Sequence, residues 1–487
     1  MVMAIGILVV LGMLAVVITT YTTSGQRSAS RSSAGVSAYS LAEAGVNNAV
    51  SMIARANSTG VWRDHVAYAT LLATPTVRSY DAGTARWWGT FDSSDPSGWQ
   101  WIVTSVGTMP NPTGAATPVT RKLSVKVPVR PSEYQHDANP AWNYIMAART
   151  GTPGGCDEAL NNSANIQSPM YVFGNLCLNT PSQITGGDLQ VLGYTKLDVN
   201  TNIGTAVLPV RNGGVHIGGG CGYKGAALGA CGPDKMVFGD PFGADPRTDI
   251  VAPAADFPLW YTHAVPGPMH KCAEQSGAVP VFDTNAPTMN DDGVGSVPTV
   301  FNLTPPSSDY SCIVRASNNA VVGQLSWNHT TGKLTVAGTI FIDGSITVNY
   351  GKTVPVDYDG RATIYATGSI FLSNTNLCAI VANGDCGFDQ WVSSEDFLEL
   401  VADGAGGGQV PVGDSIEVKS SHFEGGLWAK NAVDCLTATR TEGPMFGGHV
   451  ILDNTVYAHT WPLSVIPAGM PGSTWDDMIT DPPIDYS

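Results

Sequence analysis

The sequence predicts an α+β protein of two parts, in which a long N-terminal helix and an antiparallel β-meander precede an all-β module. Three observations predict this arrangement. No charged residue occurs before Arg27, and apolar residues continue at helical spacing beyond it. Alternating strands and turn residues follow from residue 61. After residue 143, short β-branched runs recur between glycine and asparagine residues, which favours a parallel β-solenoid.

The segment 1–60 is expected to form one apolar and then amphipathic stalk helix. The uncharged run from Met1 to Gln26 is long enough, at about 1.5 Å per residue, to cross the roughly 30 Å of membrane hydrocarbon. One apolar face then continues at steps of three and four residues: Tyr39, Ala42, Val46, Ala49, Val50 and Ile53. The alternative is a membrane-spanning helix followed by a separate soluble helix.

The apolar run has three possible purposes: a signal peptide, a membrane anchor or the packing core of a polymer. A signal peptide begins with basic residues, and none precedes this run. Its length and lack of charge therefore favour an anchor or a polymer core.

The segment 61–130 is expected to be a β-meander that packs on the helix. Leu123, Val125, Val127 and Val129 alternate with polar residues, as in a half-buried strand. A second run alternates from Trp99 to Val103, although both of its faces are fairly apolar. Clusters of proline, glycine, serine and asparagine at 94–98 and 110–114 mark the turns between the strands.

The run Met1–Thr20, the motif "SLAEAGVNNAVSMI" (40–53) and the strands "VTSVGT" and "RKLSVKV" together resemble type IV pilins, particularly PilX-like minor pilins. The resemblance implies that a prepilin peptidase removed a short leader before Met1. It implies that the precursor is anchored in the cytoplasmic membrane, and that the subunit then packs with copies of itself and other pilin-like subunits in an extracellular filament. The filament core would contain Ile5, Ile7, Leu8, Val10, Leu11, Leu14, Val17 and Ile18.

One residue departs from the pilin pattern. Pilins usually carry a glutamate at the fifth position of the mature helix, where it pairs with the N-terminal amine of a neighbouring subunit, and this chain has Ile5. A buried carboxylate needs such a partner, so its absence removes a device that sets register. Ile5 is consistent with a position at the filament tip or with a filament whose register is set by packing alone.

The segment 131–142 is the expected linker, and 143–487 is the expected glycine-rich β-module, with a loop-rich insertion at about 232–326. Val336, Ile340, Ile342, Ile346 and Val348 are the expected inward positions of one group of strands. Because the spacing of the strands is irregular, a sandwich of short antiparallel strands is the alternative to the solenoid.

Charge and cysteine usage indicate an extracellular protein. The net charge of the 487 residues is −16, and residues after 60 carry −18, which argues against nucleic acid as a partner. Nine cysteines occur without a CxxC pair, and none precedes residue 150. Proximity along the chain predicts the disulfides Cys156–Cys177, Cys221–Cys231, Cys272–Cys312 and Cys378–Cys386, with Cys435 left over.

The sequence predicts no catalytic residues and no cofactor. It has no HExxH, GxSxG or P-loop motif. Acidic pairs at Asp357/Asp359 and Glu395-Asp396, with Glu399, lie beside turn-forming residues and are interpreted as turn acids. The weak calcium candidates are Asp283, Asn285, Asp291 and Asp292, which lack EF-hand spacing.

The predicted function is a structural filament subunit whose β-module is displayed outside for adhesion or surface interaction, with a cell-surface or glycan ligand. Trp260, Tyr261, Trp391 and Trp428 are expected at loop tips, where they either contact a ligand or cap the ends of the module. The alternatives are a tip-located adhesin and a membrane-tethered enzyme that acts on glycans.

Overall fold

The computed structural model describes residues 2–59, 61, 65–92, 99–131, 139–150, 155–263, 272, 274–277, 300–315, 319, 321–388, 390–404, 415–454, 457–460, 463, 466–472 and 478–484. The chain divides into two compact units. Unit 1 comprises Met1–Ser93, Trp99–Pro131 and Asp476–Ser487, and unit 2 comprises Ser94–Gly98 and Ser132–Trp475.

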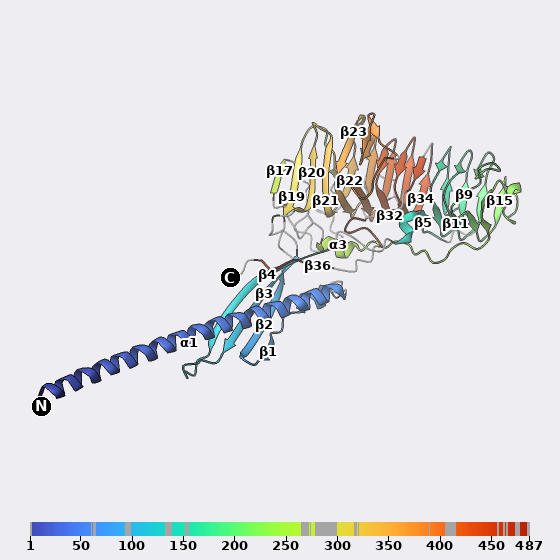
Figure 1. Cartoon of the computed structure of the whole chain (residues 1–487). Coiled ribbons are helices and arrows are strands. Elements are labelled where there is room, and N and C mark those ends of the chain that lie inside the picture. The colour runs from blue at the N-terminus through green and yellow to red at the C-terminus, as the bar shows by residue number, and fades with distance from the viewer. Residues whose placement is uncertain are drawn as a thin grey trace. The chain divides into compact units, whose positions relative to one another are not determined.

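Unit 1 is built on one long helix, α1 (Val2–Ser58), as the sequence predicts. The helix is continuous, which excludes the alternative of two separate helices. Its second half packs on a sheet, whereas its first half extends beyond the sheet of the same unit (Figure 1). Of the predicted apolar face, Ala42, Val46, Ala49 and Ile53 are buried, whereas Tyr39 is 41% exposed and Val50 is only partly buried. The buried stripe continues at helical spacing to both sides, through Ala34, Ala38, Leu41 and Ala56.

The sheet of unit 1 is the predicted antiparallel meander, and a short helix α2 (His65–Thr70) precedes it. The strands follow one another in chain order: β1 (Thr76–Tyr80), β2 (Gly83–Asp92), β3 (Trp99–Met109) and β4 (Val119–Pro131). On β4, Leu123, Val125 and Val127 are buried as their alternation predicts. Trp101 and Val103 of β3 are also buried, so this run has its apolar side toward the core.

Small residues let α1 approach β3 closely. A Cβ atom on Gly107 of β3 would lie 1.9 Å from the carbonyl oxygen of Ala38 and 2.6 Å from the backbone nitrogen of Ala42. A Cβ atom on Gly45 of α1 would lie 2.1 Å from Oγ of Ser105. The helix backbone therefore rests almost directly on the strand, and glycine is required at the contact.

The end of the chain belongs to unit 1, which corrects the expected module boundary of 143–487. Strand β36 (Met478–Thr480) pairs antiparallel with β4, where Met478 lies opposite Pro131. Ile484 and Lys126 exchange two backbone hydrogen bonds, and the amide of Asn57 donates to Oγ1 of Thr480 at 2.8 Å. Unit 2 is thus an insertion between two neighbouring strands of one sheet, a pairing that local sequence pattern does not reveal.

Removal of β36 is expected to destabilise unit 1. A chain that ends at Pro131 loses the β4–β36 backbone hydrogen bonds, worth about 2–3 kcal/mol together at roughly 1 kcal/mol each. A chain in which an Asn-Gly turn joins Pro131 directly to Met478 keeps them. Thermal unfolding followed by circular dichroism should give the joined chain the higher melting temperature. Equal melting temperatures would show that β36 is dispensable.

The described part of the expected linker 131–142 is structured, because Pro131 ends β4 and a 3-10 helix at Pro140–Asn143 buries Ala141 and Trp142. A series of very short strands follows in unit 2. The strands are β5 (Ile145–Ala147), β6 (Glu158–Leu160), β7 (Asn165–Ile166), β8 (Met170–Val172), β9 (Leu176–Leu178), β10 (Gln183–Ile184), β11 (Leu189–Val191), β12 (Thr195–Leu197), β13 (Asn202–Ile203), β14 (Val215–Ile217), β15 (Cys221–Tyr223) and β16 (Phe242–Gly243). A second 3-10 helix lies at Pro233–Lys235.

The stretch 232–326, expected to be rich in loops, contains regular elements among its described residues. Besides β16 and the 3-10 helix at Pro233–Lys235, they are α3 (Phe257–His263), β17 (Glu274–Gly277), β18 (Val300–Asn302), β19 (Tyr310–Arg315) and most of β20 (Val321–Asn328). β17, β19 and β20 pair antiparallel, and β20 continues antiparallel onto β21.

The remaining strands of unit 2 lie between residues 333 and 459. They are β21 (Lys333–Ile342), β22 (Ser345–Val348), β23 (Gly351–Asp359), β24 (Arg361–Ala366), β25 (Ile370–Ser373), β26 (Thr375–Cys378), β27 (Val381–Ala382), β28 (Asp385–Cys386), β29 (Phe397–Ala402), β30 (Ile416–Lys419), β31 (His422–Glu424), β32 (Gly426–Leu436), β33 (Arg440–Glu442), β34 (Met445–Leu452) and β35 (Tyr457–His459).

Most strands of unit 2 pair in parallel, which contradicts the alternative of an antiparallel sandwich. From β5 to β15 a strand pairs with the third strand along the chain, so that β5 pairs with β8 and β8 with β11, whereas β14 pairs with β16. The two series join where β34 pairs with β5 and β35 pairs with β7. Strands from the two ends of the inserted sequence therefore lie side by side within unit 2 (Figure 1).

One row of outward side chains on these parallel strands is mostly aromatic and is covered by another segment of unit 2. In register across β21, β24, β29, β32 and β34 lie Phe341, Tyr365, Val401, Trp428 and Phe446. The segment 244–263, including α3, covers this row, and Phe257 of α3 packs edge-on against Tyr365 with ring centroids 5.1 Å apart. These strands of unit 2 therefore have side chains buried on both faces of the sheet, the inward face in the core and the outward face under the segment 244–263.

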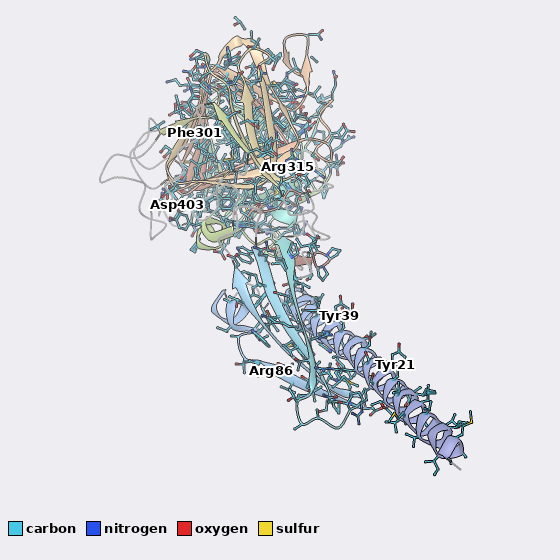
Figure 2. All side chains as sticks on the ribbon, turned by 90° about the vertical axis from the view of Figure 1, so that its left-hand side faces the viewer. Tyr21, Tyr39, Arg86, Phe301, Arg315 and Asp403 are labelled. Carbon is cyan, nitrogen blue, oxygen red and sulfur yellow. A yellow bond between two sulfur atoms is a disulfide. The ribbon has the colours of Figure 1, made fainter. Side chains whose placement is uncertain are left out.

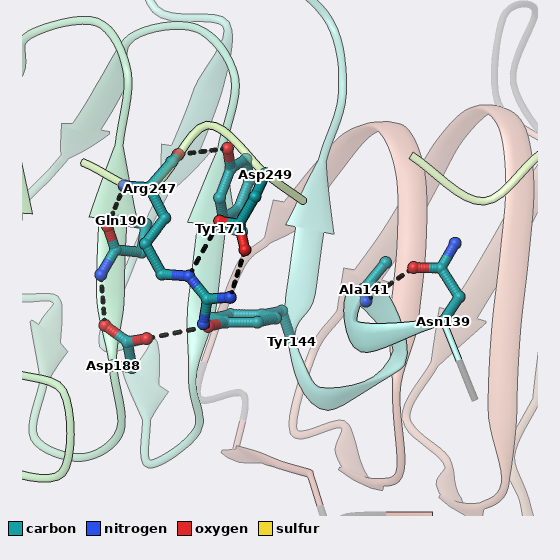
Figure 3. A network of polar contacts seen from close by, with 8 residues as sticks. All are labelled: Asn139, Ala141, Tyr144, Tyr171, Asp188, Gln190, Arg247 and Asp249. Carbon is teal, nitrogen blue, oxygen red and sulfur yellow. Dashed lines mark hydrogen bonds and ion pairs between the residues drawn. The ribbon is translucent and has the colours of Figure 1, made fainter. Parts of the chain in front are cut away.

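A polar network holds the same covering segment on β8 and β11 (Figure 3). The backbone N–H of Arg247 donates to Oε1 of Gln190 at 2.8 Å, and the hydroxyl of Tyr171 donates to the Arg247 carbonyl at 2.6 Å. The hydroxyl of Tyr144 donates to Asp188 at 2.8 Å, and burial together with this carboxylate raises the pKa of Tyr144. The network pairs the polar groups of a segment that crosses the sheet.

Candidate functional site

The first half of α1 carries the largest exposed apolar surface of unit 1. The described side chains from Met3 to Ile18 are all exposed, and the eight residues predicted for the filament core are between 51% and 69% exposed. Tyr21, labelled on the same half of the helix in Figure 2, is 81% exposed. Apolar surface of this extent is rarely left in water by a folded monomer.

The polar groups near the end of the apolar half are paired within the helix. The hydroxyls of Thr19, Thr22 and Thr23 donate to the carbonyls four residues earlier at 2.5, 2.8 and 2.7 Å. Thr20 makes the same contact with Val16. Because these hydroxyls already have acceptors, the threonines add no unpaired donor to the exposed apolar surface.

α1 is the one helix in the described residues with the length and composition to cross a membrane, at a mean hydropathy of 2.6 over its most apolar 18-residue window. The window is uncovered within unit 1. Its side chains therefore need an apolar environment from outside the folded unit, either lipid or other helices.

Four disulfides are present in unit 2, and they join Cys156 to Cys177, Cys221 to Cys231, Cys272 to Cys312 and Cys378 to Cys386. These are the pairs that proximity along the chain predicts. Cys435 is a free and fully buried thiol, and burial raises its pKa. It is therefore an inert core residue by position and by chemistry.

The interpretation as turn acids is correct for Glu395, which lies in a turn at 393–395, and wrong for Asp357, Asp359 and Glu399, which lie in strands. Asp357 and Asp359 are in β23, and Nζ of Lys333 lies 3.8 and 3.1 Å from their carboxylates. Oδ1 of Asp396 accepts the backbone N–H of Gly360 at 2.6 Å. Glu399 is fully buried in β29, and burial raises its pKa well above the ordinary value.

Metal ligands are not assembled in the part of the chain that the structure describes. No group of three His, Cys, Asp or Glu side chains there has the geometry to hold an ion. The calcium candidates Asp283, Asn285, Asp291 and Asp292 lie outside the described residues. The calcium site therefore stays a prediction.

The aromatics expected at loop tips are buried, which overturns the idea that they are exposed for a ligand. Trp260, Tyr261, Trp391 and Trp428 are 3%, 6%, 7% and 6% exposed. The indole N–H of Trp428 donates to the Pro253 carbonyl at 2.7 Å, and that of Trp391 to the Asp396 carbonyl at 2.7 Å. They belong to the packing of unit 2.

A buried carboxyl in unit 2 gives its stability a dependence on pH. Glu424 of β31 is fully buried, and its Oε2 accepts the backbone N–H groups of Ala379 and Ile380 at 2.8 and 3.0 Å. Burial raises the pKa of this carboxyl from 4.5 to about 7, and the nearby Glu442 adds to the effect. The folded state therefore binds the proton more tightly than the unfolded state does.

Unit 2 is accordingly expected to lose up to about 3 kcal/mol of stability through Glu424 as pH rises from about 4.5 to 7. Glu424→Gln keeps an oxygen acceptor and stays neutral, so its urea midpoint should change less between pH 5 and pH 8. The control is Glu395→Gln, which removes an exposed carboxyl. An identical pH dependence in wild type and Glu424→Gln would refute the assignment.

The two units define a protein with a half-exposed N-terminal helix on an antiparallel sheet, into which a large parallel β-unit is inserted. The chain is similar to a solved structure, the competence-associated pilin ComZ from Thermus thermophilus, with 14% identity and a TM-score of 0.41. The alignment covers 93% of this chain and 97% of that chain. The sequence identity and the TM-score are both low, so this likeness by itself assigns no function to the chain. No protein-family model and no curated protein matches the chain.

Proposed function

We propose that this chain is a structural subunit of an extracellular type IV pilus-like filament. The observation that carries the proposal is the division of α1, in which residues 34–56 bury an apolar stripe against the sheet of unit 1 and residues 3–18 leave theirs uncovered. A helix that ends in uncovered apolar surface has two suitable environments, a bilayer before assembly and a bundle of like helices afterwards.

The same proposal accounts for the chemistry of the rest of the chain. Disulfides and a net charge of −16 suit an oxidising compartment outside the cell and a soluble surface. We further propose that the subunit is PilX-like and that its partners are copies of itself and other pilin-like subunits. The parallel strands of unit 2 are proposed to be the turns of a β-solenoid displayed outside for adhesion.

Immuno-electron microscopy with antibodies against unit 2 tests this proposal on cells that produce the protein. Label along thin surface filaments, together with the chain in the sheared surface fraction, is the expected result. Label confined to filament ends would support the second candidate, a tip-located adhesin, with which Ile5 at the fifth position is also consistent. Chain found only in the membrane fraction, with no labelled filament, would refute both candidates.

A further inference from the structure

One outward face of unit 2 carries a row of polar side chains that the described chain leaves partly open. The row crosses β33, β35, β7, β10 and β13, which pair in parallel in that order. Its members occupy matched register positions on adjacent strands and are all partly exposed. We call them the polar track: Arg440, Tyr457, Asn165, Gln183 and Asn202.

The alternation along each strand shows that the polar track faces outward. The neighbouring register row is 0–1% exposed and forms the core: Thr441, Ala458, Ile166, Ile184 and Ile203. Successive side chains of a strand point to opposite faces. The track is therefore the solvent side of the same strands, and its length across five strands spaced about 4.8 Å apart is roughly 19 Å.

The amides of the track retain hydrogen-bonding capacity. Within the described parts of the chain, the side chain of Gln183 has no hydrogen-bond partner, and neither does that of the adjacent exposed Gln167. Oδ1 of Asn165 accepts from Thr185 at 3.2 Å, which leaves the amide N–H groups of Asn165 available. An amide ladder that served only to tie the strands together would bond Asn165, Gln183 and Asn202 to one another.

The other end of the polar track carries aromatic rings and the positively charged side chain of Arg440, which the rings contact. The guanidinium of Arg440 lies 4.7 Å from the ring centroid of Tyr457 and 3.7 Å from that of Phe388. The rings of Tyr457 and His459 are stacked, with centroids 6.4 Å apart. Two aromatic contacts restrict Arg440, so less side-chain freedom remains to be lost when a ligand binds.

We propose that the polar track binds a linear neutral glycan that lies across the strands. Amides that both donate and accept match the hydroxyls of sugars, and the partly exposed ring of Tyr457 supplies apolar contact area beside them. The charge of −18 on residues after 60 disfavours a polyanion, and a row of amides disfavours an apolar ligand. This inference rests on the proposed function in one respect, namely that unit 2 is displayed outside the cell, where it can meet a glycan.

Affinity gel electrophoresis of the full chain in a sugar-free polyoxyethylene detergent tests the proposal. The probes are dextran, hydroxyethyl cellulose, soluble starch and galactomannan, with heparin and duplex DNA as polyanions. At least one neutral polysaccharide should retard the chain. In the double variant Gln183→Ala, Tyr457→Ala, the affinity should fall about tenfold or more, because a hydrogen bond and a ring contact are lost.

The matched control is Lys196→Ala, on β12, close to β10 in the chain but in a strand that pairs with β9 and β15 outside the track. It should keep wild-type retardation. Three outcomes would each overturn the proposal. The first is that no neutral polysaccharide retards the chain, and the second is that only heparin or DNA retards it. The third is that the double variant is retarded as much as wild type while its melting temperature shows that it is folded. Normal filaments without retardation would overturn only this inference, and retardation without filaments would overturn only the proposed function.

Discussion

Leu14→Asp is expected to abolish filament assembly and to weaken membrane insertion of the chain. Leu14 lies in the exposed apolar half of α1, 51% exposed within unit 1. In a bilayer or a helix bundle it would be surrounded by apolar groups, and an unpaired carboxylate there costs several kcal/mol. At the centre of a spanning helix, aspartate costs about 2.5–3.5 kcal/mol on insertion scales. Quantifying the chain in the sheared surface and membrane fractions measures both effects.

Two variants separate the effect of position from that of charge. Leu14→Ile keeps the apolar surface and should assemble normally. Ser32→Asp places the same charge on α1 at an exposed residue beyond the apolar run and should also leave unit 1 folded. If Leu14→Asp produced filaments in normal amounts, the apolar half of α1 would not lie in the filament interior, and the proposed function would lose its main support.

Gly107→Ala is expected to destabilise unit 1 by about 3 kcal/mol, at the upper end of the usual cost of overpacking a core. The new Cβ would lie 1.9 Å from the Ala38 carbonyl oxygen, and that oxygen belongs to the backbone of α1, which moves only if the whole helix moves. Overpacking of this kind in a well-packed core typically costs about 1–3 kcal/mol and occasionally more. Differential scanning calorimetry should show the transition of unit 1 at a clearly lower temperature.

Gly89→Ala on the neighbouring strand β2 is the matched control. Its Cβ would meet side-chain atoms of Leu72 and Trp101 at 3.1–3.3 Å, and such atoms can shift by the few tenths of an ångström that are needed. Its cost should stay near 1 kcal/mol or below. Equal melting of the Gly107→Ala and Gly89→Ala chains would show that the close contact between α1 and β3 does not limit the stability of unit 1.

Part of the polar track is marked by a repeat in the sequence. Asn165-Ile166, Gln183-Ile184 and Asn202-Ile203 repeat an amide and an isoleucine at nearly constant spacing. Such a repeat places equivalent residues in register when strands stack in parallel. Arg440 and Tyr457 carry no comparable signal, because they come from the far end of the inserted sequence and meet Asn165 only through the pairing of β35 with β7.

The sequence by itself determined α1, the meander and the disulfide pairs, because each depends on residues close together in the chain. Helical periodicity, strand alternation and short loop closure are local properties. Only the tertiary structure decided that β36 returns to β4 and that the tryptophans are buried. Trp428 bonds to Pro253, 175 residues away, and Trp142 bonds to Pro471, 329 residues away. Segments far away in the chain decide which outward side chains are covered and which remain exposed. The residues that they cover show no sequence pattern that would predict this contact.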